Sequence, residues 1–158
     1  MKMAYRILAY LISLGVVLQA AAIAIGFFGL ANWVEQGGVL DKAGFESGTI
    51  SFGGLWGLEF HGTVGIMVMP ILGLLLLIAA FFTKVKGAVT WALVVLGCIV
   101  VQIVLGLFAH SFYALGFLHG LFAFAVLGTA TVAATRMTRA MKAAPAPVVG
   151  APAPADAA

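Results

Sequence analysis

The stretch A-H-S-F-Y-A-L-G-F-L-H-G-L-F-A-F-A-V-L-G, residues Ala109–Gly128, contains two of the three histidines and opens a long apolar segment. An earlier stretch, E-F-H-G-T-V-G-I-M-V-M-P-I-L-G at Glu59–Gly73, has the same plan. In each, a histidine followed by glycine stands near the start of an apolar run long enough to cross a membrane. We therefore interpret His61 and His119 as equivalent positions in two membrane-spanning helices.

The composition indicates an integral membrane protein. Of the 158 residues, 64% are hydrophobic and only 8% are charged, and the mean hydropathy is +1.19. A soluble domain of this length could not cover so much apolar surface with so few charges. The net charge of +3 comes from short basic clusters between apolar runs, which is typical of membrane topology and not of nucleic-acid binding. The single cysteine, Cys98, excludes an intramolecular disulfide and a Cys-x-x-Cys-His heme attachment.

Four apolar runs predict an all-α membrane protein, a four-transmembrane-helix bundle. The spans are expected at about residues 7–31, 59–82, 88–110 and 114–135, within a transmembrane domain of residues 1–142. The second span contains Pro70, which should kink it. An outer loop over residues 32–58 joins the first two spans. Residues 143–158, rich in alanine and proline, are expected to form a disordered cytoplasmic tail.

The basic residues predict the orientation of this bundle. Seven of the eight Lys and Arg residues fall on one side of the predicted membrane, and four of the five acids fall on the other. The positive-inside rule then places both termini in the cytoplasm of a multi-pass protein of the cell (plasma) membrane. Spans two and four both begin at the outer face, so His61 and His119 are expected at similar depth.

The two halves of the chain are interpreted as one helix hairpin that is repeated. The first helix of each half contains a single glutamine, Gln19 or Gln102, and the second helix opens on His-Gly. Both halves run in the same direction, so the pseudo-twofold axis of the repeat would lie along the membrane normal. Such an axis would bring His61 and His119 into symmetric positions about the centre of the bundle.

Two histidines at one depth on two helices are a ligand set for a b-type heme. An ionisable side chain inside a membrane span is costly and usually functional. Glycines near each histidine would leave room for a flat macrocycle to approach the helices. They are Gly57, Gly62 and Gly65 around His61, and Gly116 and Gly120 around His119. We predict that His61 and His119 ligate the iron of heme b.

The residues also leave other interpretations open. Small residues let helices pack closely, and each histidine could make an interhelical hydrogen bond instead of binding iron. Gln19 and Gln102 could likewise join helices, or contact a quinone or a heme propionate. His110, at the end of the third span, is expected at the membrane interface. A cofactor-free accessory subunit that stabilises or regulates a larger complex is therefore a second hypothesis.

Other chemistries fit the sequence less well. A zinc site needs three or four ligands, and Glu59, two residues before His61, would point to a different helix face. A di-iron bundle needs several inward carboxylates, which the other three spans lack. No phosphate-binding loop and no nucleophile–base pair stands out. The chain is therefore expected to transfer electrons or handle heme, and less to be an enzyme by itself.

With these residues in place, the stretch Leu8–Thr135 resembles one four-helix half of the heme A synthase family, and also small actinobacterial four-helix membrane proteins of unknown function. Each half of a heme A synthase carries histidines at the outer starts of its second and fourth helices, which match His61 and His119. The resemblance implies heme ligation by this pair, with a respiratory-chain protein or a quinone as partner. The family's Glu-x-x-His-Arg motif is replaced by E-F-H-G from Glu59, so heme oxidation is not implied. Only one half is present, so a two-heme arrangement would need a homodimer.

Overall fold

The computed structural model describes residues 1–143, which form helices joined by short connections. The predicted tail falls on residues 144–158, which lie outside the described residues. The elements are α1 (Lys2–Glu35), α2 (Lys42–Ser47), α3 (Leu55–Thr63), a π-helical turn (Val64–Val68), α4 (Met69–Phe81), α5 (Ala88–Ala109) and α6 (Leu115–Lys142). Four helical segments of the described chain, with α3 to α4 counted as one, are long and apolar enough to cross a membrane. The predicted all-α class with four membrane-length helices is confirmed.

The helices differ from the predicted spans mainly at their ends. The 34-residue α1 and the 28-residue α6 are longer than predicted, because hydropathy marks only the apolar part of a membrane helix. The second segment begins at Leu55 and not at residue 59, after Gly54 with a φ of 101° has turned the chain. The predicted outer loop also contains α2, whose N-cap Asp41 accepts from the Gly44 N–H at 2.7 Å.

The second membrane helix is interrupted by the π turn Val64–Val68, directly before Pro70. Proline has no N–H to donate, and its ring crowds the carbonyl of the residue four positions earlier. A π turn widens the helix locally and relieves such a conflict. Where the sequence predicted a kink at Pro70, the structure has the π-helical segment Val64–Val68, which begins three residues after His61.

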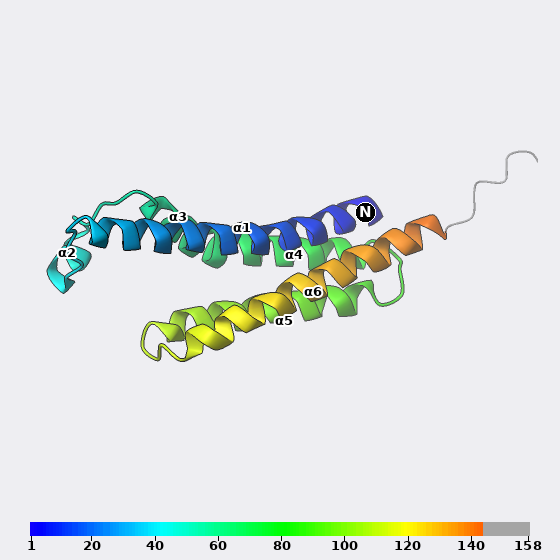
Figure 1. Ribbon diagram of the computed structural model, residues 1–158. Helices are drawn as coiled ribbons and strands as arrows, with labels where there is room; N and C mark the ends of the chain where they lie inside the picture. Colours follow the sequence, from blue (N-terminus) through cyan, green and yellow to red (C-terminus); the bar gives the residue numbers. More distant parts are fainter. Residues whose placement is uncertain (144–158) are drawn as a thin grey trace, which may run out of the picture.

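The helices α1, α3, α4, α5 and α6 form two layers (Figure 1). In one layer α1 packs against α3 and α4, and in the other α5 packs against α6; contacts of α1 with α6 and of α4 with α5 join the layers. Toward the α2 end the two layers diverge (Figure 1), and α3 makes few backbone contacts with α5 or α6.

The buried core occupies the half of the bundle that contains the N-terminus. The buried residues of α5 lie between Ala88 and Ile99, and those of α6 lie between Val126 and Met137. Many core residues are alanines, which let helices approach closely in a membrane where lipid is as apolar as the side chains. At the start of α5 the buried Tyr5 hydroxyl donates to the Ala88 carbonyl at 3.1 Å. In the opposite half, no comparable core joins the two layers within the described residues.

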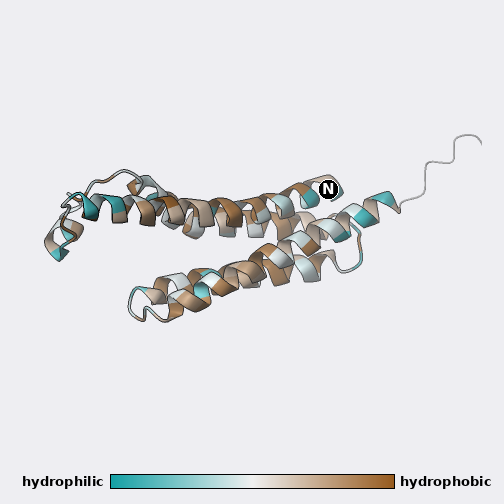
Figure 2. Ribbon diagram, viewed as in Figure 1, coloured by the Kyte–Doolittle hydropathy of each residue, from teal (hydrophilic) through white to brown (hydrophobic). Residues whose placement is uncertain are grey.

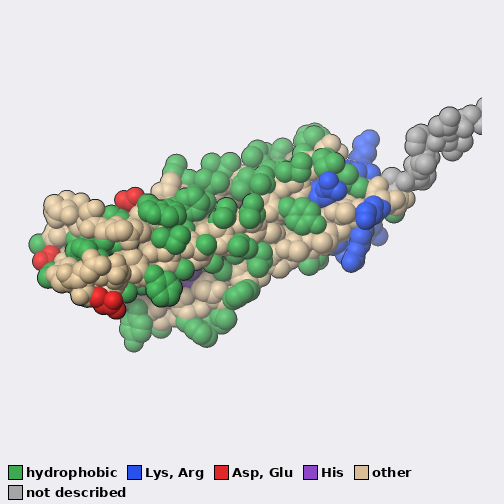
Figure 3. Space-filling model, turned by 45° about the horizontal axis from the view of Figure 1, so that its top comes forward, with side chains coloured by type: hydrophobic (Ala, Val, Ile, Leu, Met, Phe, Trp, Pro, Cys, Tyr) green, Lys and Arg blue, Asp and Glu red, His purple; other side chains and the backbone are tan. Residues whose placement is uncertain are grey.

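The surface is apolar along the sides of the bundle and polar at its two ends (Figure 2). We call one end the basic end, because Lys and Arg gather there beside the N-terminus and the end of α6 (Figure 3). The acids of the described chain, Glu35, Asp41, Glu46 and Glu59, gather at the opposite, acidic end (Figure 3).

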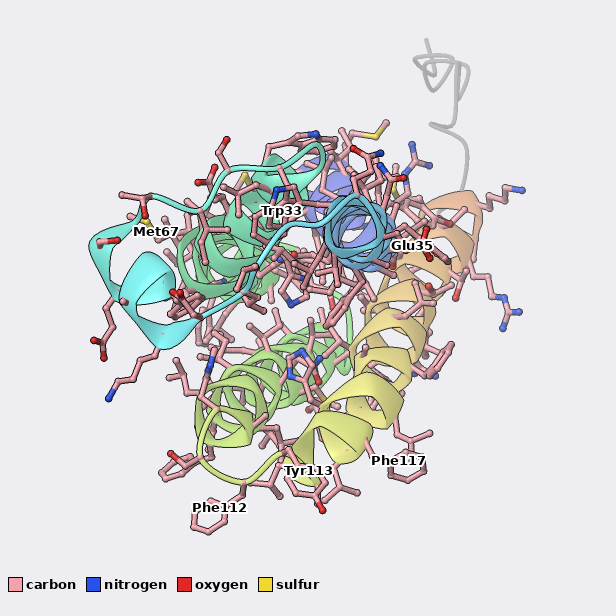
Figure 4. The ribbon with its side chains drawn as sticks, turned by 60° about the vertical axis from the view of Figure 1, so that its left-hand side comes forward. Trp33, Glu35, Met67, Phe112, Tyr113 and Phe117 are labelled. Carbon is pink, nitrogen blue, oxygen red and sulfur yellow. The ribbon has the colours of Figure 1, made fainter. Side chains whose placement is uncertain are left out.

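Large aromatic side chains surround the connection between α5 and α6 at the acidic end. Seen from this end, Phe112, Tyr113 and Phe117 point away from the bundle (Figure 4), and they are 63%, 92% and 71% exposed. Exposed aromatic residues at a helix end are typical of the boundary between the membrane and water. The apolar sides and the polar ends are consistent with a multi-pass membrane protein.

Candidate functional site

His61 of α3 and His119 of α6 face each other from the two layers. Their ring centres are 6.0 Å apart, with 66° between the ring planes. His61 is the seventh residue of α3 and His119 is the fifth residue of α6, so both lie within the first two turns of their helices. The two histidines therefore lie at one depth, where the layers begin to diverge beyond the buried core.

A pair of reciprocal hydrogen bonds holds His119 against the neighbouring helix α5. The Gln102 amide donates to the His119 backbone carbonyl at 2.9 Å. In return, Nδ1 of His119 lies 3.0 Å from the Gln102 backbone carbonyl oxygen. Because a carbonyl oxygen can only accept, Nδ1 carries the proton in this bond.

His61 is held by the same kind of reciprocal pairing with α1. Its Nδ1 lies 3.2 Å from the Gln19 backbone carbonyl oxygen. In the amide orientation that satisfies both of its ends, Gln19 donates to the His61 carbonyl at 3.1 Å and accepts from the Gly65 N–H at 2.7 Å. The amide nitrogen also lies 3.0 Å from Nδ1, and its second N–H could donate only to an unprotonated Nδ1, whereas the Gln19 backbone carbonyl can pair only with a protonated one. By analogy with His119 we assign the proton to Nδ1, which leaves that second N–H of the Gln19 amide unused.

These bonds orient both imidazoles in the way that metal ligands are usually oriented. A metal-bound histidine almost always donates its other ring N–H to a carbonyl, a carboxylate or a water, which fixes the tautomer and raises the basicity of the ligating nitrogen. With Nδ1 protonated on both rings, the two Nε2 atoms carry the free lone pairs.

The two glutamines differ in how completely they are bonded. In an α-helix the carbonyl of one residue pairs with the N–H four residues later, and Gln19 bonds to both members of such a pair, His61 and Gly65. The Gln19 side chain thus bonds to the helix backbone at the start of the π turn Val64–Val68. By contrast, the side-chain oxygen of Gln102 is buried and has no hydrogen-bond partner among residues 1–143. The Gln19 contact thus helps to explain why only the second membrane helix is irregular beside its histidine.

The glycines predicted to make room for a macrocycle fall into two groups. A Cβ at Gly57 would collide with the Ala22 carbonyl oxygen, and one at Gly65 would lie 3.1 Å from the end of the Gln19 side-chain amide. Both glycines therefore serve the close approach of α1, which differs from the role we expected for them. The others, Gly62, Gly116 and Gly120, have open space where a Cβ would stand.

One glycine at the site was not predicted to belong to it. A Cβ at Gly106 of α5 would lie 2.9 Å from Cε1 and 3.1 Å from Nδ1 of His119, so the imidazole rests against the bare backbone of Gly106. Its spacing of four from Gln102, which places both residues on one helix face, is the sequence signal that could have revealed it.

Adding a methyl group at this position should displace the His119 ring. We expect Gly106→Ala to lower heme retention by about tenfold. Changes to the residues that hold a metal ligand in place lower metal affinity by roughly 10–100-fold, and one added methyl group should fall at the lower end of that range. Gly97→Ala in the same helix is the matched control, because nothing lies within 4 Å of a Cβ there. Heme-to-protein ratios after purification would measure the difference, and equal ratios for the two variants would contradict the contact.

The other polar candidates lie apart from this pair or supply too few ligands for another metal. His110 is exposed at the end of α5. Within residues 1–143, no group of three or more His, Cys, Asp or Glu side chains is close enough to hold a metal ion. A structural zinc site needs four protein ligands, whereas a heme iron takes four of its ligands from the macrocycle and needs only two from the protein.

The fold and the histidine pair define the protein as an all-helical chain with four membrane-length helices and two facing imidazoles. Comparisons with known protein families, curated proteins and solved structures found no match. Its function is therefore interpreted from the geometry of the site.

Proposed function

We propose that this chain is a membrane protein that binds one b-type heme between His61 and His119 and transfers electrons or handles heme. The main observation in support of this proposal is the geometry of His61 and His119. Two imidazoles from different layers lie with their ring centres 6.0 Å apart, and Nδ1 of each is bonded to a backbone carbonyl.

The separation of the rings fits a shared metal ion. With metal–nitrogen bonds of about 2 Å, two imidazoles on opposite sides of one ion have ring centres roughly 6 Å apart. The ring planes can take any angle about the metal–nitrogen bonds, so the 66° between them is compatible with this arrangement.

The surroundings of the pair also suit a large apolar cofactor. Residues 100–109 of α5 and 115–125 of α6 contain no buried side chain, and α3 makes few backbone contacts with either helix. A heme bound between the two layers would cover the apolar surface that the acidic half of the bundle leaves without a packing partner. Gly62, Gly116 and Gly120 add no side chain that would obstruct it.

The matched glutamine–histidine bonds support the interpretation of the chain as two repeated hairpins. In each hairpin the glutamine and the histidine bond to each other's backbone carbonyl. Because the Glu-x-x-His-Arg motif of the heme A synthase family is missing, we propose electron transfer or heme handling and not oxidation of the heme.

When bound, a heme b iron would take up and release one electron, and the chain's own residues would hold and orient it. His61 and His119 would donate their Nε2 lone pairs, while the Gln19 and Gln102 carbonyls keep the rings oriented. A respiratory-chain protein or a quinone is the partner we propose for the electron.

We further propose that the basic end faces the cytoplasm, so that the heme lies near the outer face of the cell membrane. The Lys and Arg residues of the basic end support this orientation through the positive-inside rule.

The test is a reduced-minus-oxidised visible spectrum of the full chain purified in mild detergent from cells supplied with heme. We expect the band of a low-spin b-type heme at about one heme per chain. A flat spectrum at good protein yield would contradict the proposal.

A cofactor-free accessory subunit remains the second candidate, and one observation favours it. The reciprocal bonds already give each histidine an interhelical partner without any metal. This candidate predicts a flat spectrum and the copurification of a larger complex, so the same preparation distinguishes the two.

A further inference from the structure

The basic end concentrates positive charge without acids to balance it. Its cations are Lys2, Arg6, Lys84, Lys86, Arg136, Arg139 and Lys142, and the acids of the described chain all lie at the opposite end (Figure 3). Within residues 1–143 the only ion pair joins Lys42 and Glu46 at the acidic end, 3.6 Å apart.

Arg136 brings one of these charges to the start of a neighbouring helix. Its guanidinium lies over the Trp91 ring, 5.7 Å from the ring centre, and beside Gly87, the N-cap of α5. Gly87 offers no capping side chain, and the first turn of α5 contains no acid. Because a helix N-terminus carries a partial positive charge, a guanidinium held there adds charge of the same sign.

The same place lies at the level of lipid headgroups if α5 crosses the membrane. The 22 residues of α5 extend about 33 Å, close to the roughly 30 Å of a bilayer's hydrocarbon core. The helix start and Lys86 would then meet the headgroups, with Trp91 just inside them.

A small hollow lies beside this helix start, between α1, α5 and α6. Tyr5, Lys86, Trp91 and Arg136 are among the residues that line it. Its interior of about 10 Å³ holds no more than one water-sized group. An anion would therefore sit at the mouth of the hollow, between the two cationic side chains.

We propose that this mouth binds a phosphate anion, and that the phosphate belongs to the headgroup of an anionic phospholipid. Three sources of positive charge belong to this place: the Arg136 guanidinium beside Gly87, Lys86 among the lining residues, and the uncapped start of α5. Basic sites between membrane helices at the interface are a known mode of anionic lipid recognition. The site does not depend on the histidine pair.

Tryptophan quenching by chain-brominated lipids would test the site. The full chain, with Trp33→Phe and Trp56→Phe so that only Trp91 reports, is placed in mixed bilayers of phosphatidylglycerol and phosphatidylcholine. Each lipid is brominated in turn. We expect Trp91 to report tighter binding of phosphatidylglycerol, with Arg136→Gln or Lys86→Gln each lowering the preference about fivefold. Arg139→Gln, an exposed change of the same charge three residues along α6, should change it less than twofold.

Each result bears on the proposal. Equal binding of the two lipids, or equal losses from Arg136→Gln and Arg139→Gln, would overturn it, because general surface charge would then suffice. If the two lipids bound equally but millimolar inorganic phosphate changed the Trp91 fluorescence in a way that Arg136→Gln abolished, the anion site would stand but a lipid as its occupant would be overturned. Circular dichroism of each variant would distinguish a folding defect from a loss of lipid binding. Lys86→Gln is a second variant that tests the same site independently of Arg136→Gln.

Discussion

Replacing His61 or His119 by alanine should remove the b-type heme band. Each substitution deletes one of the two imidazoles whose rings lie 6.0 Å apart, so the iron would keep a single protein ligand and lose its low-spin spectrum. Heme content should fall by at least about tenfold, because even changes to the partners of a ligand cost roughly 10–100-fold in metal affinity. The measurement is the heme-to-protein ratio and the reduced-minus-oxidised spectrum of each purified variant.

His110→Ala is the matched control for both substitutions. It removes the third histidine of the chain, which is exposed at the end of α5, and should leave the spectrum largely intact. Added imidazole should partly restore the band in the His61 and His119 variants, because a small ligand can fill the space of the lost ring. If all three variants kept the wild-type spectrum, ligation by this pair would be wrong.

The accessory-subunit hypothesis predicts a different result for the same variants. Without a cofactor, each histidine contributes only its hydrogen bonds to the neighbouring helix. Interhelical hydrogen bonds in membranes are worth about 0.6 kcal/mol on average, so the variants would behave as mild packing mutants.

The sequence allowed the fold to be predicted closely because the membrane simplifies the problem. Apolar runs of sufficient length must be helices there, since every backbone polar group has to be satisfied within its own segment. The basic residues between the apolar runs predicted that the helices carrying His61 and His119 run in the same direction. Their similar depth followed from that direction, and the ring separation agrees with it.

The details of the site were harder to predict because they depend on contacts between helices. Hydropathy gave no sign that Gln19 would bond to His61 and Gly65 of another helix. Nor did it show that α1 would occupy the space beside Gly57, which we expected to be free for a cofactor. A glycine in a sequence indicates room, but only the packed structure shows which neighbour fills it.

The proposed resemblance to a heme A synthase half depends on the two histidines, whereas the two glutamines are shared with the small actinobacterial membrane proteins. Hydrogen bonding gives the glutamines a definite role, since each fixes its histidine through backbone carbonyls on both helices. This role is compatible with both hypotheses of function, because a rigid histidine serves a helix contact as well as a metal. What favours the heme is the distance of 6.0 Å between the two ring centres, at a depth where the layers diverge (Figure 1).

Gly57→Ala should destabilise the bundle and separate α3 from α1. A Cβ at this position would collide with the backbone carbonyl oxygen of Ala22 and would lie 3.1 Å from the backbone nitrogen of Gly26. Backbone atoms cannot rotate away as a side chain can, so the helices would have to move apart. Overpacking of this kind costs about 1–3 kcal/mol, which outweighs the gain of up to about 1 kcal/mol from the better helix propensity of alanine.

Gly62→Ala, five residues further along the same helical segment, is the matched control. Nothing lies within 4 Å of a Cβ there, so the free energy of unfolding should stay the same or rise by up to about 1 kcal/mol. Unfolding of each variant in mixed micelles of mild detergent and dodecyl sulfate, followed by circular dichroism, would measure both effects. Equal stability of the two would show that α1 and α3 do not approach as closely as the Gly57–Ala22 contact requires.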